Sequence, residues 1–200
     1  VARILMDRFN AAVIIESPHS SLDPVLAAAG IAVHRLDAVP NEGALIDVLR
    51  KTGAQVLFKR SQVRISRELL NACPDLHAIQ LCCIGSDSVD VTAASDAGVL
   101  VFNDPVSNGR SVVELAIGHL IALSRRLYET DVAMHSNEWQ KTASGRYEIL
   151  GKTLGIVGLG NIGRATARAA ESMGMTIRFY DNRLVAQEVG VEMGWERADT

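Results

Sequence analysis

The chain has 200 residues, of which 48% are hydrophobic and only 4% aromatic, so the expected core is aliphatic. The formal net charge is −3 and the isoelectric point is about 6.0, which gives no general affinity for nucleic acid or for an acidic membrane surface. No apolar run reaches the length of a transmembrane helix, and the first residues lack the apolar segment of a signal peptide. We therefore expect neither a nucleic-acid partner nor a membrane association.

In the first hundred residues, short apolar runs alternate with segments of helical pattern. The runs predict strands at residues 11–15, 31–36, 55–58, 76–82 and 100–102, with helices at 20–29, 42–51, 66–72 and 89–97 between them. Regular alternation of strand and helix predicts a parallel sheet with helices on both faces.

The three cysteines, Cys73, Cys82 and Cys83, are odd in number and do not have the spacing of metal ligands. Cys82 and Cys83 stand at the end of the fourth apolar run, which favours buried, reduced thiols. This predicts a cytoplasmic protein without a metal site.

A change of domain is expected at the sequence Asn103-Asp104-Pro105, which ends the fifth strand. Residues 1–104 then form one domain and residues 105–200 the beginning of a second. A long helix over 109–127 follows, and its apolar residues cover more than one face, which indicates burial on more than one side. Either packing between domains or a subunit interface would provide this. A second helix over 128–135 leads into a polar loop.

A glycine-rich turn between a strand and a helix is the most informative motif of the chain. Residues 153–157 form an apolar run, and Gly158, Gly160 and Gly163 then give the pattern G-x-G-x-x-G. A helical pattern and a second strand at 176–180 follow, and Asp181 stands at the end of that strand. This order predicts a dinucleotide-binding βαβ unit, with a purely structural glycine turn as the alternative.

Each residue type of the motif suits one part of a dinucleotide. Gly158 permits a tight turn, Gly160 lets the backbone approach the pyrophosphate, and Gly163 lets the helix pack closely on the strand. Asn161 and Ile162 open the helix, whose free N–H groups and positive dipole end favour phosphate. Asp181 can accept hydrogen bonds from the ribose hydroxyls and would repel a 2′-phosphate, which favours NAD over NADP. Arg183, two residues on, would weaken that preference.

The residues after Asp181 show no clear further strand. A complete Rossmann domain has about six strands, so the chain is expected to hold one full domain and the first half of a second, as a piece of a longer protein.

Several segments carry a family resemblance. They are Lys59-Arg-Ser61, residues 78–86, residues 101–115 and residues 150–163, and the similarity is good over residues 50–181. In these segments the chain resembles the NAD-dependent D-2-hydroxyacid dehydrogenases, most of all those that act on D-3-phosphoglycerate in bacteria and fungi. The resemblance implies an α/β fold with parallel sheets: a flavodoxin-like substrate domain and the first half of a Rossmann domain that binds NAD.

The resemblance also implies a reaction. It is the oxidation of D-3-phosphoglycerate to 3-phosphohydroxypyruvate, the first step of serine biosynthesis, with hydride passing to NAD. The family's catalytic Arg, Glu and His are expected beyond Thr200, so no residue of the chain is assigned a catalytic role. Two alternatives stay open: another D-2-hydroxyacid dehydrogenase, of the glyoxylate or hydroxypyruvate reductase type, or a non-catalytic NAD-sensing protein on the same fold.

Five residues are candidates for binding a small phosphorylated 2-hydroxyacid. Arg60 and Ser61 follow the third strand, Gly85 and Ser86 follow the fourth, and Asn108 opens the long helix. The alternatives are a solvated loop arginine, an ordinary strand-to-helix turn and a helix cap, respectively. We further expect a homodimer or homotetramer, with the apolar helix in the interface.

Overall fold

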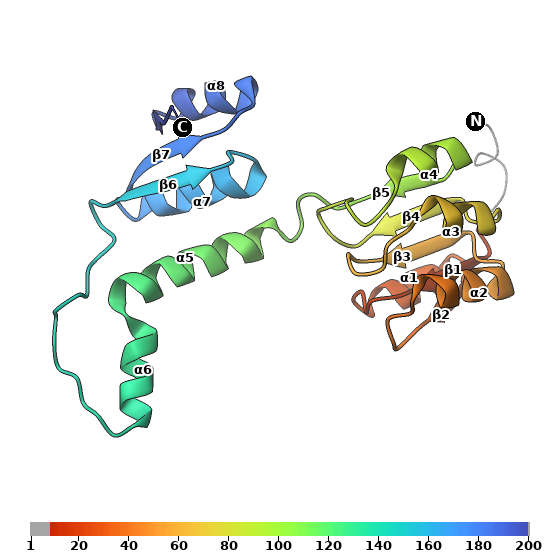
Figure 1. Ribbon diagram of the computed structural model, residues 1–200, viewed down its shortest axis with the longest axis horizontal. Helices are drawn as coiled ribbons and strands as arrows, with labels where there is room; N and C mark the ends of the chain where they lie inside the picture. Colours follow the sequence, from red (N-terminus) through yellow and green to blue (C-terminus); the bar gives the residue numbers. More distant parts are fainter. Residues whose placement is uncertain (1–8, 200) are drawn as a thin grey trace. The chain divides into compact units, whose positions relative to one another are not determined.

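The computed structural model describes residues 9–199 and divides after Pro105 into two compact units (Figure 1). Each unit is an α/β structure with a parallel sheet, as the sequence predicts.

The first unit is a five-stranded parallel sheet in the order β2-β1-β3-β4-β5. Flavodoxin-like domains have this strand order, so the predicted fold of this unit is confirmed. The strands are β1 (Ala11–Ile14), β2 (Ala32–Arg35), β3 (Val56–Lys59), β4 (Ala78–Leu81) and β5 (Leu100–Phe102); the helices are α1 (Leu22–Ala28), α2 (Glu42–Thr52), α3 (Arg67–Ala72) and α4 (Val91–Ala97).

The interior strand β1 is buried on both faces, because alternate side chains enter different apolar clusters. Val13 belongs to a cluster that includes residues of α2, α3 and α4, whereas Ile14 belongs to one that includes Leu26 of α1. Helices therefore cover both faces of the sheet, and the two clusters together form the core of the first unit.

The second unit has a three-stranded parallel sheet in the order β6-β7-β8. This order is consistent with the first three strands of a Rossmann domain. Its elements are α5 (Gly109–Arg125), α6 (Leu127–His135), β6 (Thr153–Val157), α7 (Asn161–Ser172), β7 (Thr176–Tyr180), α8 (Leu184–Glu192) and β8 (Glu196–Arg197).

The expectation of no further strand after Asp181 was wrong. Helix α8 follows, and the two residues of β8 pair in parallel with Arg178 and Phe179 of β7. The strand has no apolar run to reveal it in the sequence. It is held by its neighbour instead, through the backbone pairing and a 3.0 Å ion pair between Arg178 and Glu196.

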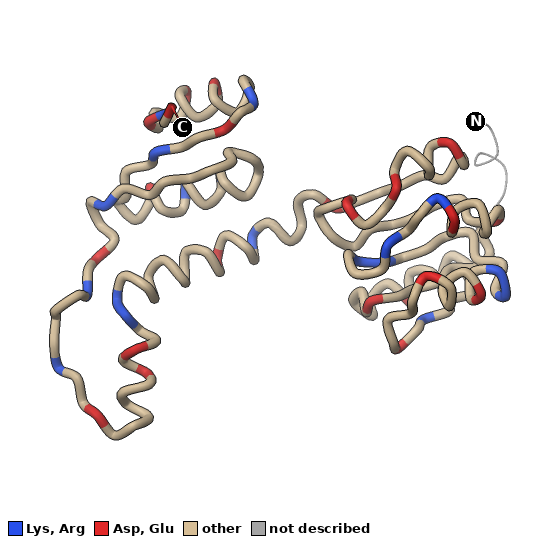
Figure 2. The backbone as a smooth tube through the Cα atoms, viewed as in Figure 1, with Lys and Arg blue, Asp and Glu red and all other residues tan. Residues whose placement is uncertain are grey.

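Helix α5 packs on α7 with one side and leaves apolar residues exposed elsewhere. Ile117 and Leu120 are partly buried against the core of the second unit, whereas the side chains of Leu115 and Leu123 are 61% and 79% exposed. Figure 2 shows the middle of this helix without charged residues. Among the described helices, none is long and apolar enough to cross a membrane.

The cysteines are free thiols, but only Cys73 is buried as expected, while Cys82 and Cys83 are half-buried. These two follow the last residue of β4, where the chain leaves the sheet. Burial raises the pKa of the Cys73 and Cys82 thiols, which keeps them protonated near neutral pH.

Candidate functional site

The carboxyl ends of β1 and β3 form the first part of the site. In the order β2-β1-β3, the chain winds outward from β1 to β2 and then returns to place β3 on the other side of β1. Ligands of open α/β sheets bind at such a switch point, outside the carboxyl ends of the strands. Glu16 lies just beyond β1, and Arg60 directly follows β3.

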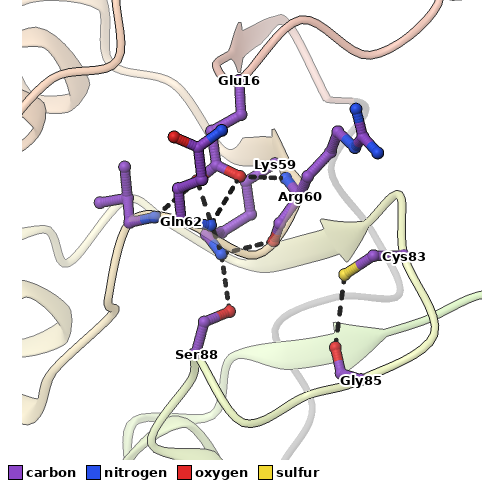
Figure 3. Close-up of polar contacts among 8 residues, drawn as sticks. Glu16, Lys59, Arg60, Gln62, Cys83, Gly85 and Ser88 are labelled. Atoms are coloured by element: carbon purple, nitrogen blue, oxygen red, sulfur yellow. Dashed lines mark hydrogen bonds and ion pairs between the residues drawn. The ribbon is translucent and has the colours of Figure 1, made fainter. Parts of the chain in front are cut away.

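Glu16 holds the backbone of the loop that follows β3. Its carboxylate accepts hydrogen bonds from the backbone N–H groups of Arg60 at 2.9 Å, Gln62 at 3.0 Å and Val63 at 2.7 Å (Figure 3). The residue is 4% exposed and has a φ of 63°, in the left-handed region that residues other than glycine seldom adopt. The loop conformation is therefore fixed by the carboxylate of a residue that follows a different strand.

Lys59 is the last residue of β3, and its side chain is completely buried. Its ammonium donates to the carbonyl oxygen of Arg60 at 2.6 Å and to the hydroxyl of Ser88 at 2.8 Å, and lies 3.8 Å from Glu16 Oε1. Burial lowers the pKa of Lys59 from its usual value, while the carboxylate of Glu16 acts in the opposite direction.

Arg60 itself presents an exposed side chain. Figure 3 shows it pointing away from Glu16 and Lys59, and its guanidinium has no hydrogen bond or ion pair with any residue in the range 9–199. Ser61 is exposed beside it. A fixed backbone with a free guanidinium is what binding of an anionic group requires, because the planar fork of arginine suits phosphate and carboxylate.

The loop after β4 lies next to the Arg60 loop at the same sheet edge. Gly85 is exposed and Ser86 half-buried, and the backbone N–H of Ile65 donates to the carbonyl of Ser88 at 2.8 Å. A parallel bridge between Ile65 and Val89 completes the connection of the two loops. The structure thus brings four of the five predicted substrate residues to one edge of the first unit.

The fifth candidate, Asn108, belongs to the second unit, at the start of α5. It is exposed, and its side chain makes no capping hydrogen bond. Two residues on, Arg110 forms an ion pair with Glu114 at 2.5 Å along the exposed helix surface.

The glycine-rich turn has the backbone that its sequence predicts. Gly158 has a φ of 94°, which only glycine adopts readily. A Cβ on Gly163 would collide with the carbonyl oxygen of Gly158, so close packing of α7 on the turn requires glycine there. A Cβ on Gly160 would meet only the Arg183 guanidinium, at an ordinary 3.7 Å. Nothing in the described protein excludes a side chain at Gly160, so the residue leaves room for a ligand.

Helix α7 begins at the turn with Asn161 and Ile162. No side chain caps its first N–H groups, and the Asn161 side chain accepts instead from Arg164 at 2.9 Å. The uncapped helix N-terminus favours an anion, as the pyrophosphate of a dinucleotide would be.

Asp181 links β7 to the turn. Its carboxylate accepts from the backbone N–H of Leu159 at 2.6 Å and from that of Arg183 at 2.8 Å. The guanidinium of Arg183 donates to both carboxylate oxygens, at 3.1 and 3.0 Å. The contact with Arg183 and these N–H groups hold the pKa of Asp181 well below its usual range. The residue types and their arrangement fit a dinucleotide, with Arg183 covering part of the carboxylate expected to meet the ribose.

Sequence reasoning missed the roles of Glu16, Lys59 and Ser88. A signal was present, because a charged residue follows each of two apolar runs: Glu16 comes directly after residues 11–15, and Lys59 directly after residues 56–58. In a parallel sheet both residues come to the same edge, but their contact also requires that β1 and β3 be neighbours.

Comparison with known proteins gives consistent results. The sequence profile of "D-isomer specific 2-hydroxyacid dehydrogenase, catalytic domain" matches residues 12–182. The D-3-phosphoglycerate dehydrogenases of Escherichia coli and Haemophilus influenzae are 40% and 37% identical over 174 residues, covering 84% of the chain and 41% of each relative. The chain thus spans about two fifths of the length of these curated relatives.

Solved structures agree on the fold. A phosphoglycerate oxidoreductase from Vibrio cholerae matches with a TM-score of 0.70 at 25% identity, over 96% of the chain and 62% of that structure. A glyoxylate reductase from Paecilomyes thermophila matches with a TM-score of 0.80 at 23% identity, over 96% and 61%.

Proposed function

Because the chain belongs to the D-isomer specific 2-hydroxyacid dehydrogenase family, we propose that its protein oxidises D-3-phosphoglycerate to 3-phosphohydroxypyruvate with NAD. This would be the first step of serine biosynthesis. The observation that carries the choice of a phosphorylated substrate is Arg60, an exposed guanidinium on a loop fixed by Glu16 at the switch point of the sheet. The names of the two bacterial relatives compared above support the same choice.

The second unit would hold the cofactor. Gly158, Gly160 and Gly163 would admit the pyrophosphate, the N–H groups at Asn161 and Ile162 would bind it, and Asp181 would accept from the ribose hydroxyls. The nicotinamide supplies the hydride acceptor. We thus propose that residues 1–104 bind the substrate and that the domain beginning at residue 105 binds NAD.

The first unit would hold the substrate. Arg60 binds the phosphate by charge-assisted hydrogen bonds and Ser61 adds a hydroxyl donor, while Gly85 exposes backbone N–H groups to a carboxylate. Ser86 and Asn108 are the remaining contacts of the proposal. We assign the catalytic Arg, Glu and His to the part of the protein beyond Thr200. These residues would bind the groups on the reacting carbon and move the proton of its hydroxyl. The half-buried free thiols of Cys82 and Cys83 suit a reducing, cytoplasmic location.

The test is steady-state kinetics of the full-length protein, with NADH and three substrates: phosphohydroxypyruvate, hydroxypyruvate and glyoxylate. We expect the highest kcat/KM with phosphohydroxypyruvate. A higher value for glyoxylate or hydroxypyruvate would assign the protein to another D-2-hydroxyacid dehydrogenase, and turnover of none would favour a non-catalytic NAD-binding role.

Cofactor choice is tested by titrating the full-length protein with NADH and NADPH. We expect tighter binding of NADH, because the ionised Asp181 would repel a 2′-phosphate. Arg183→Ala should increase the preference, because Arg183 now neutralises that carboxylate. Arg178→Ala is the matched control, since Arg178 pairs with Glu196 instead. Tighter binding of NADPH by the unmodified protein would contradict the assignment.

A further inference from the structure

We propose that Lys59 is a positioning residue, which holds the loop after β3 and the loop after β4 in the mutual arrangement that the substrate requires. The inference rests on the proposed function, because these loops carry the candidate substrate residues. Lys59 cannot meet the substrate itself, since its side chain is 0% exposed.

The geometry that carries the inference is a bridge made by one ammonium group. Lys59 Nζ donates to the carbonyl of Arg60 in one loop and to the Ser88 hydroxyl in the other, at 2.6 and 2.8 Å. We call these two hydrogen bonds the Lys59 bridge. The carboxylate of Glu16 forms an ion pair with the same ammonium at 3.8 Å and accepts hydrogen bonds from backbone N–H groups of the first loop (Figure 3). Loops that follow three neighbouring strands, β1, β3 and β4, are therefore joined at one buried point.

Stability alone does not account for a buried lysine at this position. Removing two charges from water costs free energy that their attraction often fails to recover, and apolar replacements of similar volume are commonly as stable. The other residues of β3 are apolar, and a methionine would be suitable in length for the same space. What an apolar residue cannot provide is a simultaneous link to a carbonyl, a hydroxyl and a carboxylate.

Strain at Glu16 is a second observation that points to positioning. Its backbone lies in the left-handed region, with Ser17 after it at a φ of 50°. Such conformations cost free energy and persist only where the surroundings hold them. Here the carboxylate is held by three backbone N–H groups and by Lys59, so the same contacts that hold the strained turn also hold the Arg60 loop.

The decisive experiment is Lys59→Met in the full-length enzyme. We expect the KM for phosphohydroxypyruvate to rise roughly 10- to 100-fold, because displacement of an orienting group by an ångström has effects of this size. The kcat should change much less, because Arg60 binds a non-reacting part of the substrate. In an Arg60→Ala background the same substitution should add little, because Lys59 acts through Arg60.

A matched control separates positioning from stability. Leu26→Ala removes a buried side chain of α1 from the apolar cluster on the other face of the sheet, whose described residues all lie outside both loops. It should lower Tm at least as much as Lys59→Met and leave KM unchanged. An unchanged KM in Lys59→Met, or an equal rise in Leu26→Ala, would overturn the proposal.

Ser88 provides a milder variant in case Lys59→Met does not fold. Ser88→Ala removes one half of the Lys59 bridge and should raise KM, whereas Ser88→Thr keeps the hydroxyl and should restore it. A KM in Ser88→Ala equal to that of the unmodified enzyme would overturn the proposal.

Failure of the proposed function has a separate signature, namely that the unmodified enzyme turns over none of the substrates. In that case, amide hydrogen exchange of residues 60–65 and 84–89 tests whether the Lys59 bridge joins the two loops. Faster exchange of both segments in Ser88→Ala supports the joining of the loops, and unchanged exchange refutes it.

Discussion

Arg60 combines a fixed backbone with an exposed side chain. Its N–H and carbonyl groups are held by Glu16 and Lys59, while its guanidinium stays exposed. The loop is therefore already ordered when the protein folds, so ligand binding does not incur the entropic cost of ordering it. The ligand consequently binds more tightly than it would to a flexible loop.

Arg60→Ala should weaken binding of phosphohydroxypyruvate by about 1.5–3 kcal/mol, or about 10- to 150-fold in apparent affinity, because charge-assisted hydrogen bonds are lost. Arg60→Lys should recover only part of this, since an ammonium lacks the bidentate fork. The measurement is kcat/KM with phosphohydroxypyruvate and hydroxypyruvate as paired substrates.

The loss should be much smaller with hydroxypyruvate, which has no phosphate, and NADH binding should hardly change. Equal losses with both substrates would assign Arg60 to the carboxylate or to a structural role. No loss with either would leave it a solvated loop residue.

Asp181 should make the stability of the second unit sensitive to acid. Its folded pKa lies below the usual 3.8 because Arg183 and two N–H groups stabilise the carboxylate. A depressed pKa contributes stability above the unfolded value, and that contribution is lost as the pH falls below about 4. Asp181→Asn should therefore reduce the decline of Tm between about pH 4 and pH 2. Parallel Tm profiles for the two proteins would contradict this.

Helix ends illustrate what local sequence achieves at the scale of single elements. Asn41, Ser66 and Asp90 each accept a hydrogen bond from the backbone N–H three residues on, at the start of α2, α3 and α4. Such signals depend only on near neighbours in the chain. These helices were predicted from their helical pattern, within one or two residues of their observed bounds. The two-residue strand β8 has no comparable signal, because its pairing partner supplies the structure.

Helix α5 was expected to lie in a subunit interface, and this stays a prediction. The structure sharpens it, because Leu115 and Leu123 are the largely exposed leucines, while Ile117 packs against the core of its own unit. Leu115→Glu with Leu123→Glu should dissociate a dimer into folded monomers, whereas Ile117→Glu should unfold the unit. Sedimentation and circular dichroism separate the two outcomes. An unmodified full-length protein that sediments as a stable monomer would remove the basis for this idea.

At the scale of the whole chain, the first unit has a core of its own. Both apolar clusters of that unit consist of residues before Pro105, and they lie on opposite faces of a five-stranded sheet. A chain cut after Pro105 should therefore fold by itself and unfold cooperatively in urea. Coincident unfolding transitions measured by circular dichroism and by amide hydrogen exchange would confirm this. A broad transition that differs between the two probes would contradict it.

The sequence by itself determined the alternation of strands and helices, the parallel sheets and the dinucleotide motif. Strands β6 and β7 were predicted with their observed bounds, and the conformation of Gly158 and the packing of Gly163 follow from their places in the turn. These features depend on hydrophobic periodicity and on residues close together in the chain, which a sequence displays directly.

Only the tertiary structure decided which charged residues meet. Glu16 follows β1 and Lys59 ends β3. These strands are separated in the chain by α1, β2 and α2, and the two residues pair because β3 lies beside β1 in the sheet. Ser88 joins them because β4 lies next to β3. Likewise, the division of α5 into core-facing and exposed leucines depends on where α7 packs. Contacts of this kind arise from strand order and helix packing, so no local pattern of residues reveals them.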